Sequence, residues 1–324
     1  MALDCAGGPT LCSTHLGNTV PPSTQEKMIS FVKRRTRKFV AAAVGTFSIG
    51  RVAGPPSLED GFVNYPTREG RAEAYRAEPK SGRVLGQVVV IHEVWGLTQS
   101  VRDACDRLSR HGFIAVAPLL YWRDRELFSP DKIREGMKLV WGLTLEERYR
   151  PRLLAAALQK GRASKETALM LRTFYDKGFR RLLLRDLRSL EAHLRKESPD
   201  LGAGTVGFSM GGKLAMQLAG SSPGLDACVA YSAEPVRGAV LAKIRCPMLL
   251  LYGSEDKFMT RKLGAFVQEA VAKGIELELK IYRSAGHEFF DGANKKEYRA
   301  AAAERAWVAS SDFLTRQLSP KPRP

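Results

Sequence analysis

The stretch Thr205-Val206-Gly207-Phe208-Ser209-Met210-Gly211-Gly212 changes from a strand-forming run to a helix-forming one within a few residues. Residues 205–208 predict a buried strand, and residues 211–219 predict a helix. A serine on so sharp a turn needs neighbours without side chains two positions away on each side, and Gly207 and Gly211 supply them. The spacing G-x-S-x-G therefore predicts that the hydroxyl of Ser209 stands exposed at the end of a strand. Because the chain has 29 glycines, the motif also arises by chance and needs support from its surroundings.

The regions around this turn alternate short apolar runs with helical stretches. Val88 to Ile91 are all β-branched, which is typical of a strand buried on both faces. Strands separated by helices give a mostly parallel sheet with helices on both faces, so we expect a doubly wound α/β fold. The expected strands span 61–66, 71–78, 84–92, 113–118, 205–208, 227–231, 247–252 and 277–282, and the expected helices include 99–111, 211–219 and 295–317.

The texture of the sequence divides the chain into a leader, one domain and a tail. Residues 1–58 are rich in small and polar side chains, and we expect an irregular basic leader that is disordered or serves in targeting. Within it, residues 28–54 place a basic cluster before a short apolar run, as a signal peptide does, which would make the protein exported rather than cytoplasmic. The domain itself is expected over 59–318, followed by a flexible tail at 319–324. Residues 129–177 predict a basic helical insertion, either lying over the strand ends or forming a solvated outer layer.

Composition limits the class of protein. The 324 residues are 44% hydrophobic and 26% charged, which suits a globular domain and excludes collagen, coiled coil and disorder over the full length. No apolar run is long enough to span a membrane. The five cysteines form neither a CxxC pattern nor a dense disulfide framework. A net charge of +17 attracts anions without naming one, and we expect no nucleic-acid partner. Monomer and dimer both stay open.

A serine hydroxyl needs a base, and the base needs a group that holds its tautomer. Among the five histidines, His287 alone lies in a small-residue loop directly after a predicted strand, where ligand-binding loops of parallel sheets gather. Asp256 lies in the turn after the expected strand 247–252, so its carboxylate is a candidate to hold the tautomer of His287. Glu255 is the alternative for this role. The order nucleophile, acid, base along the chain is that of the α/β-hydrolase fold. We therefore expect Ser209, Asp256 and His287 to form a catalytic triad.

The segment that begins at His92 could be mistaken for half of a zinc site. An HExxH helix needs a second histidine one turn later, but Gly96 stands there, so we expect no metal. The turn can instead supply a backbone N–H at Val94. Together with the N–H of Met210, this group would hold the oxyanion of a tetrahedral intermediate.

Five ordered motifs resemble those of the dienelactone hydrolase family: residues 89–97, 112–118 leading to Tyr121, the turn around Ser209, 251–256 and 285–290. The resemblance spans roughly residues 61–318. It implies a single α/β-hydrolase domain with a helical insertion, no cofactor, and hydrolysis of small esters or lactones of the carboxymethylenebutenolidase kind. It also makes Glu93 the glutamate that the family keeps beside its nucleophile.

Two departures from that family stand out. Position 209 is Ser, whereas the family's usual nucleophile is Cys, so the role of Glu93 beside a hydroxyl is open between positioning the hydroxyl and a structural one. The carboxylate-binding arginine of the family corresponds to Arg134 or Arg123, and for either one an ordinary solvated charge is an equal alternative. Aromatic side chains at Trp95 and Tyr121 are candidates to line a pocket, or to belong to the core.

These observations predict a serine hydrolase that cleaves a small ester or lactone through an acyl-enzyme. Two alternatives use the same chain differently. A thioester, a longer-chain ester or a polyester would be cleaved by the same triad. A non-catalytic basic protein would use the hydrolase fold only to bind an anionic partner.

Overall fold

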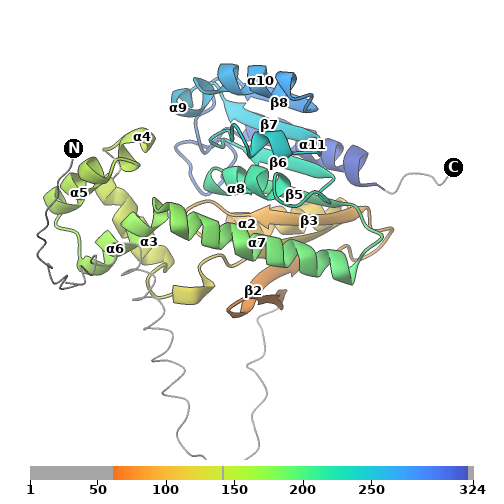
Figure 1. Cartoon of the computed structure of the whole chain (residues 1–324), viewed down its shortest axis with the longest axis horizontal. Coiled ribbons are helices and arrows are strands. Elements are labelled where there is room, and N and C mark those ends of the chain that lie inside the picture. The colour runs from red at the N-terminus through yellow and green to blue at the C-terminus, as the bar shows by residue number, and fades with distance from the viewer. Residues whose placement is uncertain (1–60, 141, 320–324) are drawn as a thin grey trace, which may run out of the picture. The chain divides into compact units, whose positions relative to one another are not determined.

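The structure, a computed structural model, describes residues 61–140 and 142–319. Its centre is one eight-stranded sheet in the order β1-β2-β4-β3-β5-β6-β7-β8 (Figure 1). The β1–β2 and β2–β4 pairs are antiparallel, and all other pairs are parallel. The expected mostly parallel α/β sheet is therefore confirmed. The strands are β1 (Phe62–Thr67), β2 (Gly70–Ala77), β3 (Gly86–Ile91), β4 (Phe113–Pro118), β5 (Ala203–Phe208), β6 (Ala227–Tyr231), β7 (Met248–Gly253) and β8 (Leu277–Tyr282).

Helices cover both faces of this sheet. One apolar cluster joins the sheet to α2 and α11, and a second joins it to α7, α8 and α10. Every residue of β3, β4, β5, β6 and β7 is buried, as the continuous apolar runs predict. The helices are α2 (Gln99–Arg110), α3 (Pro130–Val140), α4 (Leu145–Arg148), α5 (Pro151–Lys160), α6 (Lys165–Phe174), α7 (Lys177–Glu197), α8 (Met210–Ala219), α9 (Lys257–Thr260), α10 (Leu263–Ala272) and α11 (Ala300–Leu318), with short 3₁₀ turns at Trp122–Asp124 and Leu241–Lys243.

The last helix begins later than the sequence indicates. We expect helix from residue 295, but α11 starts at Ala300. Polar groups before it bond the local backbone instead, since the N–H of Glu297 donates to Oδ1 of Asn294 and the N–H of Asn294 donates to the carbonyl of Asp291. Asn and Asp in such positions favour turns over helix.

The segment 129–177 is helical, as expected, and consists of α3 to α6. Side chains cap two of these helices: Thr144 and Glu147 form a capping box at α4, and Ser164 accepts from a backbone N–H at the start of α6. Glu146 of α4 forms an ion pair with Arg261, which follows α9. The segment therefore contacts the loop beyond the carboxyl end of β7.

None of the helices among the described residues is long and apolar enough to span a membrane. The leader interpretation of residues 1–58, including the signal-peptide alternative at 28–54, lies outside the described residues. The same holds for 320–324 of the expected tail.

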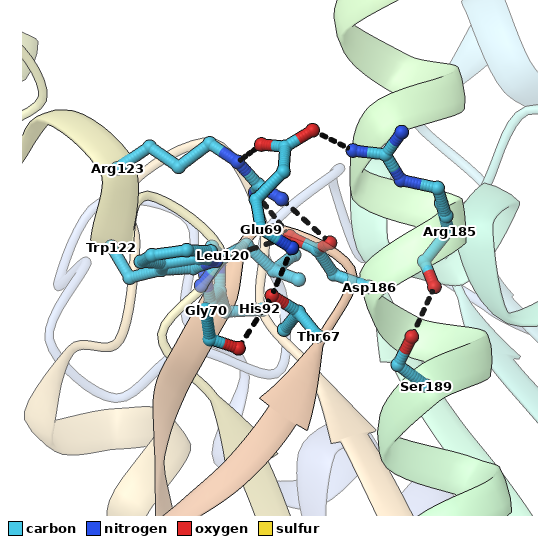
Figure 2. A network of polar contacts seen from close by, with 10 residues as sticks. All are labelled: Thr67, Glu69, Gly70, His92, Leu120, Trp122, Arg123, Arg185, Asp186 and Ser189. Carbon is cyan, nitrogen blue, oxygen red and sulfur yellow. Dashed lines mark hydrogen bonds and ion pairs between the residues drawn. The ribbon is translucent and has the colours of Figure 1, made fainter. Parts of the chain in front are cut away.

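A buried ion pair holds the segment after β4 against α7 (Figure 2). The guanidinium of Arg123 binds both carboxylate oxygens of Asp186, and Nη2 lies 2.9 Å from Oδ1. The indole of Trp122 donates to the same carboxylate at 3.1 Å. Only 1% of the Asp186 side chain and 10% of the Arg123 side chain are exposed. Glu69, in the β1–β2 turn, bridges Arg123 to Arg185 of α7 and so ties the first hairpin to this helix.

Removing one charge of this pair should destabilise the protein strongly. In Asp186→Ala the buried guanidinium of Arg123 keeps only Glu69 as a partner, and we expect the free energy of unfolding to fall by roughly 3 kcal/mol. Urea unfolding followed by circular dichroism measures the change. The control is Asp131→Ala, which removes the exposed partner of Arg134 and should leave the unfolding midpoint unchanged. Equal midpoints in the two variants would contradict the importance of the buried pair.

Candidate active site

Ser209 sits at the junction of β5 and α8 in a backbone conformation that is rare for a residue with a side chain. Its φ is +48° and its ψ is −109°. A Cβ on Gly207 would lie 2.2 Å from the carbonyl oxygen of Gly211, and one on Gly211 would lie 2.1 Å from that of Ile91. Both glycines are therefore required by close backbone approach. The N–H of Ser209 donates to the carbonyl of Tyr231 at 2.8 Å, which holds the turn to β6.

The structure brings Ser209, His287 and Asp256 together from three separate loops. The hydroxyl of Ser209 donates to Nε2 of His287 at 2.8 Å, and Nδ1 of His287 donates to Oδ2 of Asp256 at 2.5 Å. Asp256 caps α9 after β7, and His287 follows β8. The two loops meet at Gly253, where a Cβ would lie 2.2 Å from the carbonyl oxygen of Ala285. Glu255, the alternative acid, is exposed.

The surroundings of His287 favour its protonated form. Burial alone would lower the pKa of the imidazole, but the hydrogen bond and the negative charge of Asp256 outweigh it, and Glu288 and Glu297 add to them, so the pKa is raised. The carboxylate of Asp256 is itself buried. A base held in one tautomer by a buried acid can accept a proton from the hydroxyl and return it later.

Two backbone N–H groups at this position are free to bind an oxyanion. Among the described residues, neither the N–H of Val94 nor that of Met210 has a hydrogen-bond acceptor. Met210 is the first residue of α8, where helical N–H groups have no partner within the helix. The hydroxyl of Tyr121 donates to the carbonyl of Val94 at 3.1 Å and so holds the turn after β3 in place.

His92 is structural. Its Nδ1 donates to the carbonyl of Glu93 at 2.7 Å, and its Nε2 accepts from the N–H of Leu120 at 3.3 Å. Complete burial lowers the pKa of His92 to about 4, so the ring is neutral. It links the loops after β3 and β4. No group of three potential metal ligands occurs in the part of the chain that the structure describes.

Glu93 lies close enough to Glu288 and Asp291 to be affected by their charges. We call these three residues the acidic corner; sequence reasoning identified Glu93 but not the other two. Burial raises the pKa of the Glu93 carboxyl well above the ordinary value, and the charges of Glu288 and Asp291 raise it further. Trp95 donates from its indole N–H to Glu288 at 3.3 Å. The hydroxyl of Ser209 has His287 as its one hydrogen-bonding partner among the described residues. The sequence does point to Glu288 as a residue of the site, because it directly follows His287.

The two arginines considered for a substrate carboxylate have different surroundings. The guanidinium of Arg123 binds Asp186 and Glu69 (Figure 2), because a buried guanidinium needs an acidic partner. Arg134 is exposed on α3 and pairs with the exposed Asp131, so it is the solvated charge that the sequence analysis gave as the alternative. Asp186, 63 positions from Arg123 in the sequence, carried no signal that could have shown its pairing with Arg123. Tyr121 is buried and packs against other aromatic rings, so it belongs to the core.

Arg180, at the start of α7, is a cation near this site that the sequence did not single out. Its guanidinium donates to the hydroxyl of Tyr149 at 2.6 Å and to the carbonyl of Phe174 at 3.3 Å. No carboxylate pairs with it among the described residues. Its charge lowers the pKa of Tyr121, against the larger effects of burial and Glu93, which raise it. Arg180 therefore links the start of α7 to Tyr149 and to the end of α6.

Comparison with known proteins agrees with this geometry. The model of the dienelactone hydrolase family matches residues 72–318. A Saccharolobus solfataricus protein named "Putative carboxymethylenebutenolidase" is 30% identical over 258 residues, 78% of this chain and 97% of that protein. A dienelactone hydrolase structure from Anabaena variabilis has a TM-score of 0.55 at 18% identity, covering 79% of this chain and 96% of that one. A dienelactone hydrolase-like promiscuous phosphotriesterase from metagenomic libraries has a TM-score of 0.54 at 19% identity, covering 80% and 98%. The structural likenesses show the α/β-hydrolase fold, and the sequence matches show that the chain belongs to the dienelactone hydrolase family and is a hydrolase.

Proposed function

We propose that the protein is a serine hydrolase that cleaves small esters or lactones through an acyl-enzyme. The observation that carries this proposal is the hydrogen-bonded chain from Asp256 through His287 to Ser209, with the serine held on a strained turn. A hydroxyl in this arrangement loses its proton to the imidazole as it attacks a carbonyl carbon. The family supports a hydrolase, and its members named carboxymethylenebutenolidase support a lactone or ester as substrate.

The reaction proceeds in two halves. The oxygen of Ser209 attacks the carbonyl carbon while Nε2 of His287 takes the proton, and the N–H groups of Val94 and Met210 bind the negative oxygen. The intermediate collapses when His287 returns the proton to the leaving alkoxide, which leaves the acyl group on Ser209. Water, deprotonated by His287, then attacks the acyl ester, and His287 returns that proton to the departing oxygen of Ser209 as the acid is released. Asp256 keeps the proton on Nδ1 and stabilises the imidazolium throughout.

The insertion limits the size of the substrate. Glu146 binds Arg261 beyond β7, and Tyr149 binds Arg180 near the turn of Val94. These contacts support an insertion that reaches toward the loops after β7 and β3, and on this proposal it favours small acyl groups over long chains. Long-chain esters, polyesters and thioesters are the alternatives on the same triad.

A non-catalytic binding protein is disfavoured by the site itself. Ser209 is held at positive φ by the close backbone approach around it, a conformation that costs on the order of 1–3 kcal/mol, and it also bonds His287. A protein that only binds anions through surface charge has no use for this strain. The net positive charge is therefore secondary to the activity.

Replacing the nucleophile should abolish turnover. For Ser209→Ala we expect kcat for a p-nitrophenyl acetate substrate or a small lactone to fall by about 10⁶, since a triad without its nucleophile loses nearly all of its effect. A fluorophosphonate probe should label Ser209 in the unchanged protein, as peptide mapping by mass spectrometry would show. The control is Ser221→Ala, whose hydroxyl bonds only to carbonyls of α8. Full activity in Ser209→Ala would exclude the proposed nucleophile.

Activity should depend on pH through His287. Only the neutral imidazole can act as base, so kcat/KM should rise with pH, and its inflection should lie above the ordinary imidazole pKa of about 6.5 because Asp256 raises that pKa. In Asp256→Asn the inflection should move down and kcat should fall by about 10⁴. Initial rates from pH 5 to 9 measure both effects. A flat profile would show that His287 is not the base.

A series of esters tests the class of substrate. We expect kcat/KM for p-nitrophenyl esters to be highest for acyl chains of two to four carbons and to fall by at least about tenfold by eight, where a helical insertion would collide with the chain. An acyl thioester of equal length serves as the comparison. Rising values with chain length would favour the long-chain alternative, and faster thioester cleavage would favour a thioesterase. Either result would leave the Ser209 assignment intact.

A further inference from the structure

The last strand of the sheet, β8, has one open edge. It pairs with β7 on one side and with no other described strand, and it lies at the border of the sheet in Figure 1. The carbonyl groups of Glu276 and Tyr282 accept from β7 and from the residue after it. Since alternate residues of a strand face opposite sides, the N–H and C=O groups of Leu277, Leu279 and Ile281 point away from the sheet. An unpaired edge of this kind can receive another strand.

The side chains along this edge separate by face. Leu277, Leu279 and Ile281 lie on the face covered by α10, and 51% of Ile281 is exposed. Glu278 and Lys280 lie on the other face, where Glu278 pairs with Arg316 of α11. The edge therefore offers an apolar row on one face and one acidic and one basic side chain on the other.

We propose that a second copy of this chain binds here, with its own β8 antiparallel to the first and the two-fold axis at Leu279. In this register Leu277 faces Ile281 of the second copy, and Leu279 faces its equivalent. The outward N–H and C=O groups of these three residues then pair completely. The two sheets become one continuous sheet across a symmetric interface.

Charge selects this register over its neighbours. The outward groups can pair only if odd-numbered residues face odd-numbered ones, so the register shifts in steps of two. A shift in one direction places Glu278 opposite Glu278 of the second copy while Lys280 faces Glu276, and a shift in the other places Lys280 opposite Lys280. Only the register centred on Leu279 places Glu278 opposite Lys280 twice and leaves no like charges opposite each other. Like charges directly opposite each other are destabilising, whereas opposite charges stabilise a strand pair.

The same charges explain why the edge selects its own copy. A lysine on an edge strand commonly prevents pairing with unrelated strands, but here it has a matching glutamate two residues away on the same strand.

Exposed apolar side chains also occur on both flanking helices, at Val271 of α10 and Val308 of α11. The active site lies at the carboxyl ends of the strands rather than at this edge, so dimer formation leaves it open.

The concentration dependence of the oligomeric state tests the proposal. We expect sedimentation velocity of the full chain to show a monomer–dimer equilibrium. Lys280→Glu should raise its dissociation constant at least about tenfold, because Glu278 then faces a second glutamate. Lys160→Glu makes the same change on α5, where the side chain is exposed, and should leave the constant unchanged. Unchanged esterase activity and thermal midpoint show that each variant is folded.

A mixture of variants makes the test specific for the register. Glu278→Lys and Lys280→Glu should each be monomeric alone, but their mixture should form a heterodimer, since every facing pair is again of opposite charge. Hydrogen exchange should show protection at the amides of Leu277, Leu279 and Ile281 that grows with protein concentration. A wild-type monomer at about 100 μM would overturn the proposal, since a pair with a dissociation constant on the order of 1 μM would be almost entirely dimeric there. So would a dimer that both single variants retain.

Discussion

The close approach of backbone at Gly211 is the constraint on which the site depends. The Cα of this residue lies so near the carbonyls at the end of β3 that no side chain fits between them. That contact sets α8 against β3, and it fixes two features at once. Ser209 is forced into its strained turn, and the N–H of Met210 comes to the side of the sheet where the turn of Val94 begins. One steric requirement thus shapes both the turn that holds the proposed nucleophile and the proposed oxyanion site. Even the Cβ of alanine would not fit at position 211, so glycine is needed there.

The histidines show how burial and partners give one residue type two roles. His92 and His287 both lie beyond the carboxyl ends of strands, His92 after the buried β3 and His287 after the edge strand β8. His92 has only backbone partners, so burial lowers its pKa and it stays neutral as a link between loops. His287 has Asp256 at 2.5 Å, and that negative charge more than offsets the burial. The carboxylate, rather than the position at a strand end, separates a base from a structural ring.

The sheet and the three triad residues could be predicted from sequence because their signals are local. Apolar runs mark the buried strands, and the glycines around Ser209 mark a turn with a mechanical need for them. Partners that meet only through the fold leave no such signal. Arg123 was expected either to bind a substrate carboxylate or to be a solvated charge, but it forms a buried pair with Asp186 on a distant helix. The start of α11 was also misplaced, because side chains such as that of Asn294 bond the local backbone and delay the helix.

The state of Glu93 bears on how a hydroxyl can replace a thiol in this family. A charged carboxylate next to the turn of Val94 would repel the oxyanion of the proposed mechanism, since charges a few ångströms apart interact strongly when water is excluded. Burial, together with the charges of Glu288 and Asp291, raises the pKa of Glu93 and favours its neutral form. A neutral acid does not oppose the developing negative charge, and it does not compete with Asp256 for the imidazole. The raised pKa of Glu93 is therefore compatible with the proposed nucleophile Ser209, which would be activated by His287 and Asp256.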